Sequence, residues 1–279
     1  MALKIVTDSS SDLPLELAKE LGITIVPLYV RFGKEVFRER VEIGDEEFYR
    51  RLVSGPVHPV TIQPSPQDFA EAYKKVAAEA DGIVSLHISS KLSGTYNSAL
   101  QGKEIAQVKC PIEVIDSLSV SVGLGLLSIL ASNAAKSEAS LPQVVKDAKQ
   151  AIPDVHLLGL VDTLKYLLLG GRIGRAKALV GSILNVKPLL TLENGETVPV
   201  GQARTRAKGI ERLFNFVAGA TSVQDVAVAY STTLDEAKAL AERIGSAAKV
   251  AVRVVRLGTT LGVHLGPGSL VLSFIGKQR

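Results

Sequence analysis

The feature that most constrains the fold is a unit of apolar strand, hydroxyl-rich loop and helix that occurs three times in the first half of the chain. Residues 3–7, 82–88 and 111–115 are short, apolar and β-prone, and serines follow each of them. Short apolar runs of this kind are typical of buried strands in a parallel sheet. Because helical segments alternate with these strands, the first half is expected to be a parallel-sheet α/β domain.

The three loops carry similar side chains at equivalent places. They contain Asp8-Ser9-Ser10, Ser89-Ser90 and Asp116-Ser117. The carboxyl ends of parallel strands meet at one edge of a sheet, so we expect the loops to lie together, with Asp8 and Asp116 facing each other. A serine at such a place also caps helices, which is the simpler interpretation of one loop alone. Three such loops predict a polar crevice for an anionic oxygen, either a carboxylate or a phosphate.

The second half is predicted to be α/β with antiparallel pairing. Strands are expected at residues 155–161, 187–192, 197–200, 226–230, 250–257 and 270–275, and helices at 162–169, 178–184, 204–218 and 234–244. An Asn-Gly turn of the hairpin type joins the second and third of these strands. The chain is therefore expected to have two domains, an N-terminal one at residues 1–153 and a mixed-sheet α/β C-terminal one at residues 154–279.

Two segments with candidate site residues are expected to be irregular. Residues 56–66 contain four prolines, which argues against a regular element and for a rigid loop that holds Thr61. Residues 262–268 are glycine-rich and predict a tight loop that carries His264. An imidazole can donate a hydrogen bond to a carboxylate, although an exposed loop histidine explains this local pattern equally well. Residues 23–30, by contrast, are expected to form one strand.

Composition limits the classes that remain. The most apolar segment, residues 120–135, is interrupted by glycine, serine and asparagine, and it is shorter than the roughly 20 apolar residues that a membrane span needs. It is expected to be a buried helix. Cys110 is the one cysteine, so the chain can form no internal disulfide. Together with an N-terminus that lacks the pattern of a signal peptide, this favours a cytoplasmic location.

Positive charge gathers in one window of the second half. Residues 165–212 hold nine lysines and arginines but three acids, whereas the net charge of the whole chain is +4. Such a patch suits a phosphate, an acidic partner or nucleic acid, and a solvated basic face is the simpler explanation. Nucleic-acid binding is disfavoured because aromatic residues do not interleave with the charges.

The motifs of common catalysts are absent from the sequence. There is no Gly-x-Ser-x-Gly elbow, no phosphate-binding loop ending in Gly-Lys-Ser/Thr, and no Gly-x-Gly-x-x-Gly after the first strand. The four histidines and the lone cysteine show no metal-ligand spacing. Hydroxyls and one histidine bind an anion well but offer little catalytic power. We therefore expect a binding protein, and keep open an enzyme for a phosphorylated small molecule that uses Asp8, Asp116 and His264, or a docking module built on the basic window.

Six motifs together resemble, in order, the DegV family of bacterial fatty-acid-binding proteins. They are Thr7-Asp8-Ser9-Ser10, Val60-Thr61-Ile62-Gln63-Pro64-Ser65, Ser89-Ser90-Lys91-Leu92-Ser93-Gly94-Thr95-Tyr96, Asp116-Ser117, Gly170-Gly171-Arg172-Ile173 and His264-Leu265-Gly266-Pro267-Gly268. The resemblance spans the whole chain. It implies two α/β domains that enclose one long-chain fatty acid, with the acyl tail in an apolar tunnel and the carboxylate near the domain junction.

The resemblance also implies a lipid-binding role in fatty acid activation. A carrier of this kind is not itself an enzyme and presents the acid to a partner fatty-acid kinase. It is expected to need no cofactor or metal, to bind no nucleic acid and to have no membrane span, while transient contact with a membrane is compatible with the role. The carboxylate contacts carried over are Thr61, Ser93 with the following Gly94 and Thr95, and His264. Arg172 and Arg204 match basic surface positions where the kinase docks.

Two residues depart from the family pattern, and the lining of the tail is not given by any motif. Ile62 stands where a small polar residue is usual, and Val263 stands where a threonine is expected before the histidine. Both departures bear on the hydrogen bonding of the head group. Residues 120–135 and 178–184 are the segments expected to line the acyl tail.

Overall fold

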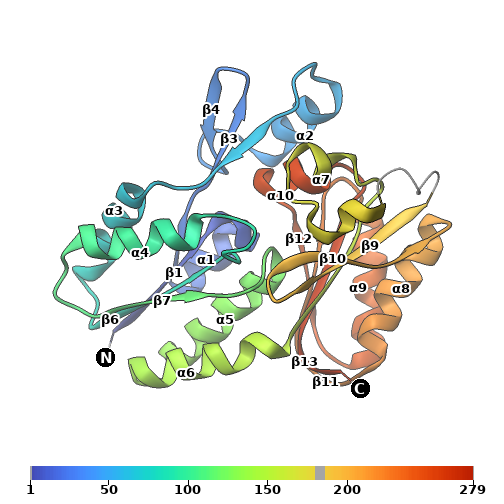
Figure 1. Cartoon of the computed structure of the whole chain (residues 1–279). Coiled ribbons are helices and arrows are strands. Elements are labelled where there is room, and N and C mark those ends of the chain that lie inside the picture. Colours follow the sequence, from blue (N-terminus) through green and yellow to red (C-terminus); the bar gives the residue numbers. More distant parts are fainter. Residues whose placement is uncertain (1, 180–185, 279) are drawn as a thin grey trace.

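The computed structural model of this chain, described for residues 2–179 and 186–278, contains two main sheets, one from each half of the sequence (Figure 1). The first sheet has the strand order β2-β1-β6-β7, and all of its neighbouring pairs are parallel. Its strands are β1 (Leu3–Asp8), β2 (Ile23–Val26), β6 (Gly82–His87) and β7 (Ile112–Asp116). The predicted parallel sheet is therefore confirmed.

Helices cover both faces of this sheet. One face carries α3 (Pro66–Ala77) and α4 (Thr95–Ala106), and the other carries α1 (Leu15–Leu21), α5 (Val122–Lys136) and α6 (Leu141–Ala151). The N-terminus of α3 shows why the chain turns there, because Ser65 and Asp68 form a reciprocal capping box and Pro66 follows the cap.

The second sheet is mixed, as predicted. Its order is β10-β9-β8-β13-β11-β12, in which the pair β11–β12 is parallel and the other pairs are antiparallel. Its strands are β8 (Val155–Leu160), β9 (Lys187–Glu193), β10 (Glu196–Ala203), β11 (Ala220–Tyr230), β12 (Val252–Arg256) and β13 (Leu270–Gln278). Helices α8 (Arg206–Ala218) and α9 (Leu234–Ala248) cover its outer face.

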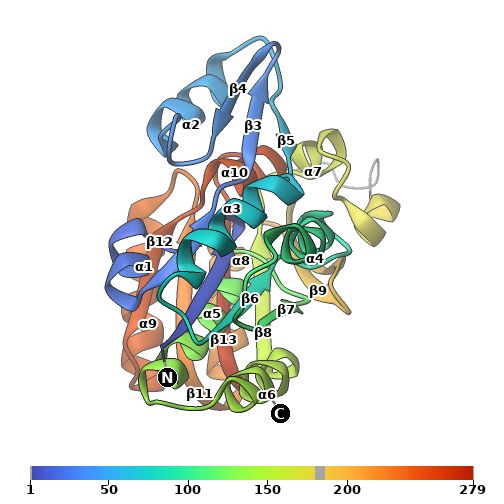
Figure 2. The ribbon, with the colours of Figure 1, turned by 90° about the vertical axis from the view of Figure 1, so that its left-hand side faces the viewer.

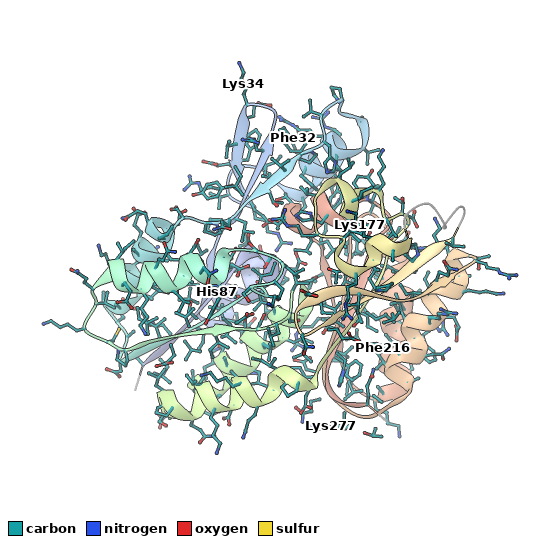
Figure 3. The ribbon with its side chains drawn as sticks, viewed as in Figure 1. Phe32, Lys34, His87, Lys177, Phe216 and Lys277 are labelled. Atoms are coloured by element: carbon teal, nitrogen blue, oxygen red, sulfur yellow. The ribbon has the colours of Figure 1, made fainter. Side chains whose placement is uncertain are left out.

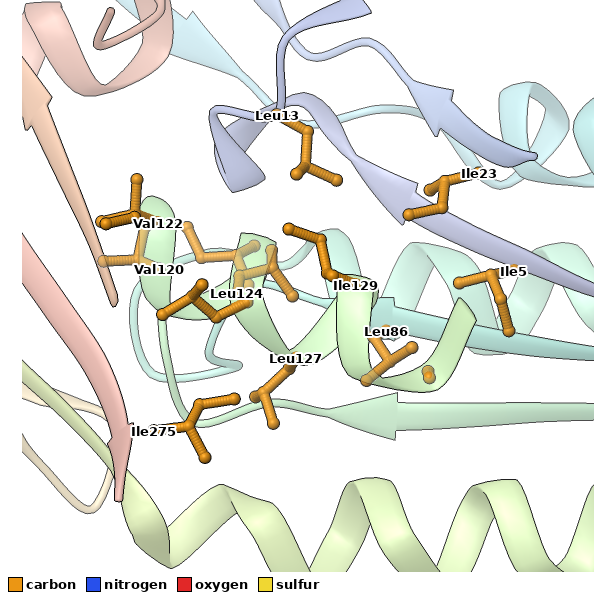
Figure 4. Packing of buried hydrophobic residues seen from close by; sticks show 14 of the residues in the cluster. Ile5, Leu13, Ile23, Leu86, Val120, Val122, Leu124, Leu127, Ile129 and Ile275 are labelled. Carbon is orange, nitrogen blue, oxygen red and sulfur yellow. The ribbon is translucent and has the colours of Figure 1, made fainter. Parts of the chain in front are cut away.

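Helix α5 lies between the two sheets. It contacts β1 and β6 on one side and β8, β11 and β13 on the other. A helix that is enclosed on all sides must be apolar all round, which explains why the sequence of α5 is so hydrophobic. Figure 4 shows Val122, Leu124 and Leu127 of α5 packed between Leu86 of β6 and Ile275 of β13. Because this apolar cluster draws on both halves of the chain, the boundary between residues 153 and 154 stays a prediction.

A small third sheet stands above the main body (Figure 2). It consists of β3 (Tyr29–Phe32), β4 (Glu35–Arg38) and β5 (Val60–Ile62), and α2 (Asp45–Ser54) packs beside it. The hairpin β3–β4 projects outward, with Lys34 at its tip (Figure 3). Two predictions fail here. The single strand at 23–30 is two strands of different sheets, and part of the proline-rich segment is the strand β5.

The reason for both errors is tertiary. Pro27 separates β2 from β3. The local sequence does not indicate that the chain passes from the first sheet to the small third sheet at this point. Prolines restrict pairing only where an N–H is needed, and β5 lies between Pro59 and Pro64 at the edge of its sheet.

The segment around His264 is a helix, not the loop that its glycines predict. Helix α10 spans Thr259–Leu265, and Gly266 ends it with a φ of +76°. The glycine-rich pattern thus marks the C-terminal end of a short helix. Helix α7 (Lys165–Leu169) is shorter than predicted, and residues 180–184 of the helix predicted at 178–184 lie outside the described residues. No helix in the described ranges is both long and apolar enough to cross a bilayer.

Candidate functional site

A cavity of about 320 Å³ lies between the inner face of the second sheet and α10. Apolar side chains from several elements form most of its wall, among them Leu28, Leu157, Val161, Leu190, Leu261 and Val271. The volume and the apolar lining are typical of a site for a small hydrophobic ligand.

The place of the cavity follows from where α5 begins. That helix fills the space between the two sheets from Val122 onward, and Val120 and Ser121, just before it, line the cavity. Beyond the N-terminus of α5, residues of α10 are among those that border this space. The cavity therefore occupies the same layer of the molecule as α5.

One part of the cavity wall is polar. The Oγ1 atom of Thr61, on β5, lies 3.0 Å from Nε2 of His264, on α10. The Oγ atom of Ser93 lies 2.8 Å from Oγ1 of Thr95 and also accepts a hydrogen bond from the backbone N–H of Thr95 at 3.3 Å. Thr61, Ser93 and His264 all line the cavity, so hydroxyls and one imidazole gather at a largely apolar space.

His264 is a neutral group in this environment. Burial is the main reason that its pKa falls to about 3, and the positive charge of Arg172 and the ring of His58 add to the shift. His264 is 9% exposed, and its Nδ1 atom is buried without a hydrogen-bond partner in the part of the chain described. A neutral imidazole can donate from one nitrogen, so the site offers hydrogen bonds without a fixed positive charge on the ring.

Two buried carboxylates from the first half of the chain hold the helix that carries His264. Glu39 accepts hydrogen bonds from the backbone N–H of Thr260 at 2.9 Å and from its Oγ1 at 2.7 Å, and Asp12 accepts from the N–H of Gly258 at 2.8 Å. Burial raises the pKa of Asp12 to about 7. Acidic groups at a helix N-terminus stabilise it, so the position of α10 depends on segments more than 200 residues away.

Gln63 is a further polar residue at the cavity. It follows Thr61 by two residues, just after the end of β5, lines the cavity, and donates a hydrogen bond from Nε2 to Oγ of Ser98 at 3.1 Å. A Cβ atom at Gly94 would collide with the side chain of Gln63. A side chain at position 94 would therefore displace the amide end of Gln63, and the place of Gln63 in the same motif as Thr61 was the sequence signal for it.

Arg172 stands at the mouth of the cavity. It is exposed and also lines the cavity. Its guanidinium donates hydrogen bonds to two backbone carbonyls, from Nε to Leu92 O at 3.2 Å and from Nη1 to Gly170 O at 2.8 Å. The geometry therefore brings a positive charge close to Ser93 and His264. Arg204 is exposed after the end of β10 and does not line the cavity.

Comparison with known proteins places these features in a family. The model of a family described as "Uncharacterised protein, DegV family" matches residues 2–277. A DegV domain-containing protein of Streptomyces coelicolor is 39% identical over 273 residues, which are 95% of each chain. The chain belongs to the DegV family. The resemblance carried by the six sequence motifs is thereby confirmed.

Solved structures of other DegV proteins share the whole fold. A DegV family protein of Thermus thermophilus, described by its fatty acid binding, is 34% identical with a TM-score of 0.91. The match covers 99% of this chain and 100% of the Thermus protein. DegV of Bacillus subtilis, described as a fatty acid binding protein, is 29% identical with the same TM-score and coverage. A stearic acid-binding protein of Eubacterium ventriosum is 27% identical with a TM-score of 0.89 and coverage of 99% and 98%. The predicted fold class is confirmed by these similarities.

The polar crevice predicted from the three serine loops of this DegV protein is not formed. The loops do meet at one edge of the first sheet, but their polar atoms bind one another. Asp8 accepts hydrogen bonds from Ser10, His87 Nδ1 at 3.0 Å and Ile88 N–H at 3.1 Å, and Asp116 accepts from the N–H groups of Ser90 and Leu118. None of the Asp8, Ser89 or Asp116 side chains lines the cavity.

The second half of the chain closes over these loops. Ser89 donates from Oγ to the carbonyl of Gly195, at the turn between β9 and β10, at 2.8 Å. Asp8 and Asp116 have separate sets of partners and do not face each other across an open site. The DegV fold thus uses the strand ends as a structural joint, while Ser93, later in the second loop, reaches the cavity.

Of the two segments predicted to line an acyl tail, residues 120–135 contribute little, and residues 180–184 of the other lie outside the described residues. Of residues 120–135, Val120 and Ser121 line the cavity, while the rest of α5 fills the core. Several of the lining residues come from β8, β9 and α10, whose segments had been predicted as two ordinary strands and as a loop that carries His264. Among residues 2–179 and 186–278, no three His, Cys, Asp or Glu side chains lie close enough together to hold a metal ion.

Proposed function

We propose that this protein binds a long-chain fatty acid, with the acyl tail in the cavity and the carboxylate at Thr61, Ser93 and His264. The observation that carries the proposal is the contrast within one cavity, an apolar wall with three neutral hydrogen-bonding groups in one part of it. Fatty acid binding by DegV proteins of Thermus thermophilus and Bacillus subtilis supports it.

The energetics suit an amphiphile. Burial of a palmitoyl tail gains about 0.8 kcal/mol per methylene, on the order of 10 kcal/mol in total before losses. A carboxylate that enters with the tail must be hydrogen-bonded, or its desolvation removes much of that gain. Hydroxyl donors meet this need.

The hydroxyls are set up to donate. Ser93 Oγ accepts the N–H of Thr95, and when the Thr95 hydroxyl also donates to it, the hydrogen of Ser93 is left for a ligand oxygen. When the proton of His264 is on Nε2, the ring donates to Thr61, and the Thr61 hydroxyl is free to donate as well. Gly94 and Thr95, at the start of α4, complete the proposed head-group region.

Lipid content tests this proposal directly. Native mass spectrometry of freshly purified protein is expected to show a bound fatty acid, and delipidated protein should bind palmitic acid saturably. The variant Thr61→Ala/Ser93→Ala should lose ligand. The control Thr221→Ala/Ser222→Ala, which also removes one threonine and one serine hydroxyl but at exposed positions, should keep it. Absence of lipid together with absence of saturable binding would refute the proposal.

We further propose that the protein is a carrier, which presents the carboxylate to a partner fatty-acid kinase in the cytoplasm and does not itself catalyse a reaction. A histidine whose pKa is about 3 is a poor general base at neutral pH, which argues against hydrolysis by the Thr61–His264 pair. Arg172 at the mouth and the exposed Arg204 are the proposed docking residues.

The carrier role is tested with purified components. Protein loaded with palmitic acid should give no acyl phosphate with ATP alone and should give it when a fatty-acid kinase is added. Formation of acyl phosphate, or hydrolysis of phosphate esters, by the protein alone would contradict the carrier role but leave fatty-acid binding intact.

A further inference from the structure

Gly159 is the one glycine among the described residues that line the cavity. It lies inside β8 and is paired on both sides, with Val271 of β13 and with Leu190 of β9. A glycine in the interior of a paired strand weakens that strand, and it often marks a place where a ligand approaches closely. The position therefore calls for a reason outside strand stability.

Packing within the protein does not supply that reason. A Cβ atom at position 159 would meet Leu190 O at 3.7 Å and Leu270 O and a Val271 methyl group at 4.0 Å, which are ordinary contacts. By contrast, a Cβ atom at Gly94 or Gly170 would collide with Gln63 or His264. The backbone of Gly159 also lies outside the left-handed region, so any residue could adopt it.

The missing side chain leaves a depression in the cavity wall. Directly paired residues of neighbouring strands share a face, as do alternate residues of one strand. The neighbours of Gly159 on its face are Leu157, Leu190 and Val271, and all three line the cavity. Gly159 is thus a gap surrounded by large apolar side chains that all point to the same space.

The depression lies part-way into the cavity. Val161 packs with Leu167 and Leu265, which belong to the elements around His264. Along β8, Gly159 is about 7 Å from Val161, and Leu157 is about 7 Å further still. An acyl chain whose head group is at His264 therefore crosses Gly159 with its middle and reaches Leu157 with its end.

We propose that Gly159 is a specificity-determining position, at which the absent side chain lets the middle of a long acyl chain cross the second sheet. The inference rests on the proposed fatty-acid binding. It names the substrate class more closely, as acids with long tails whose far half needs the space over Gly159. A side chain at this position fills the depression, so the cavity would then accept only shorter acids.

The experiment compares Gly159→Ala, Gly159→Val and Gly159→Leu with the unchanged protein, all delipidated, for binding of palmitic and decanoic acid. Affinity for palmitic acid should fall in that order, by more than about tenfold for Gly159→Leu because several methylenes lose their burial. Affinity for decanoic acid should stay within about threefold. Gly44→Leu is the matched control, because Gly44 is an exposed glycine with nothing within 4 Å of its Cβ direction and does not line the cavity.

Stability of the ligand-free variants separates this role from a structural one. Gly159→Ala should unfold at the same or a higher denaturant concentration than the unchanged protein, since it removes a strand glycine, and yet bind palmitic acid more weakly. If Gly159→Leu does not fold, the graded pair Gly159→Ala and Gly159→Val carries the comparison. Equal affinity for palmitic acid in all folded variants would overturn the inference while the unchanged protein still binds. Failure of the unchanged protein to bind either acid would instead overturn the proposed function, and this inference with it.

Discussion

The Asp8–His87 network and the Thr61–His264 pair each join a histidine to hydroxyl groups, but they differ in what surrounds them. His87 lies inside the first half (Figure 3), with Nδ1 on Asp8 and Nε2 on Ser85 at 2.7 Å, and Ser85 in turn bonds Tyr73 at 2.9 Å. All four side chains are fully buried. In His264, Nε2 bonds the Thr61 hydroxyl and Nδ1 has no partner in the part of the chain described. The cavity lies beside this histidine.

The difference shows what separates a structural polar cluster from a binding one. In the Asp8–His87 network every group shown has its partner inside the protein, so a ligand oxygen has nothing to bind. One hydrogen bond joins Thr61 and His264, Nδ1 of His264 has no partner in the part of the chain described, and both residues line a largely apolar cavity. A serine, a histidine and an aspartate in sequence are therefore weak evidence of a site until their partners are known.

The largest effect is expected from Asp8→Ala. The change leaves the Ile88 N–H, the Ser10 hydroxyl and His87 Nδ1 without their buried acceptor, so the free energy of unfolding should fall by roughly 3 kcal/mol or more. Denaturant unfolding measures it. Affinity of the folded variant for palmitic acid should change less than about threefold. A normal stability with lost binding would place Asp8 in the site and break the comparison.

The next effect is on binding and comes from Thr61→Ala/Ser93→Ala. Loss of two hydrogen bonds to a carboxylate is expected to weaken binding of palmitic acid by at least about a hundredfold, since hydrogen bonds to charged groups contribute about 1.5–3 kcal/mol each. The unfolding free energy should fall by less than about 1 kcal/mol, because both side chains are only partly buried. Isothermal titration and denaturant unfolding give the two numbers, and a loss of stability without a loss of affinity would contradict the assignment.

The pH dependence of stability sharpens the contrast further. His264 has a pKa near 3 in the folded protein, whereas an unfolded histidine titrates near 6.5, so below that value the unfolded chain binds a proton that the folded chain refuses. Its contribution is present above pH 6.5 and is lost as the pH falls toward 3. Between pH 6.5 and about 5 the unchanged protein should lose about 2 kcal/mol more than His264→Gln does. Parallel curves for the two proteins would contradict a neutral buried His264.

The smallest effect distinguishes the two arginines. Arg172→Glu puts a negative charge at the mouth and should weaken binding of palmitic acid by a few-fold at low ionic strength, because the Arg172 side chain is exposed and screened. Arg204→Glu reverses the same charge away from the cavity and should leave lipid affinity unchanged. Competition with a fluorescent fatty acid measures both, and equal effects would remove Arg172 from the mouth of the site.

Several parts of the molecule could be read from local patterns. The serine loops, the Asn-Gly turn and the all-round apolar α5 follow from periodicity, turn chemistry and burial, and each was found close to its predicted place. The errors came where a distant segment decides. The strand β5 exists because it pairs with β3, and α10 is a helix whose N-terminus is bound by Glu39 and Asp12.

The candidate site divides in the same way. Thr61, Ser93 and His264 were named from motifs, and the structure brings all three to one cavity. Gln63 stood inside a quoted motif without a role, and Arg172 was assigned to a docking surface alone. Leu157, Gly159 and Leu190 could not be recognised as lining, because in sequence a strand face that borders a cavity looks the same as one that borders core.

The sequence by itself determined most strands of the two main sheets and the buried helix between them, since burial periodicity and turn residues are local properties, and it determined the family through six ordered motifs. Only the tertiary structure decided which polar groups are satisfied and which are left to bind. That choice depends on atoms from segments far apart, such as Thr61 and His264, which are 203 residues apart yet share a hydrogen bond. It also depends on where α5 begins, because that helix fills the space between the two sheets from Val122 onward and the cavity lies at its N-terminus.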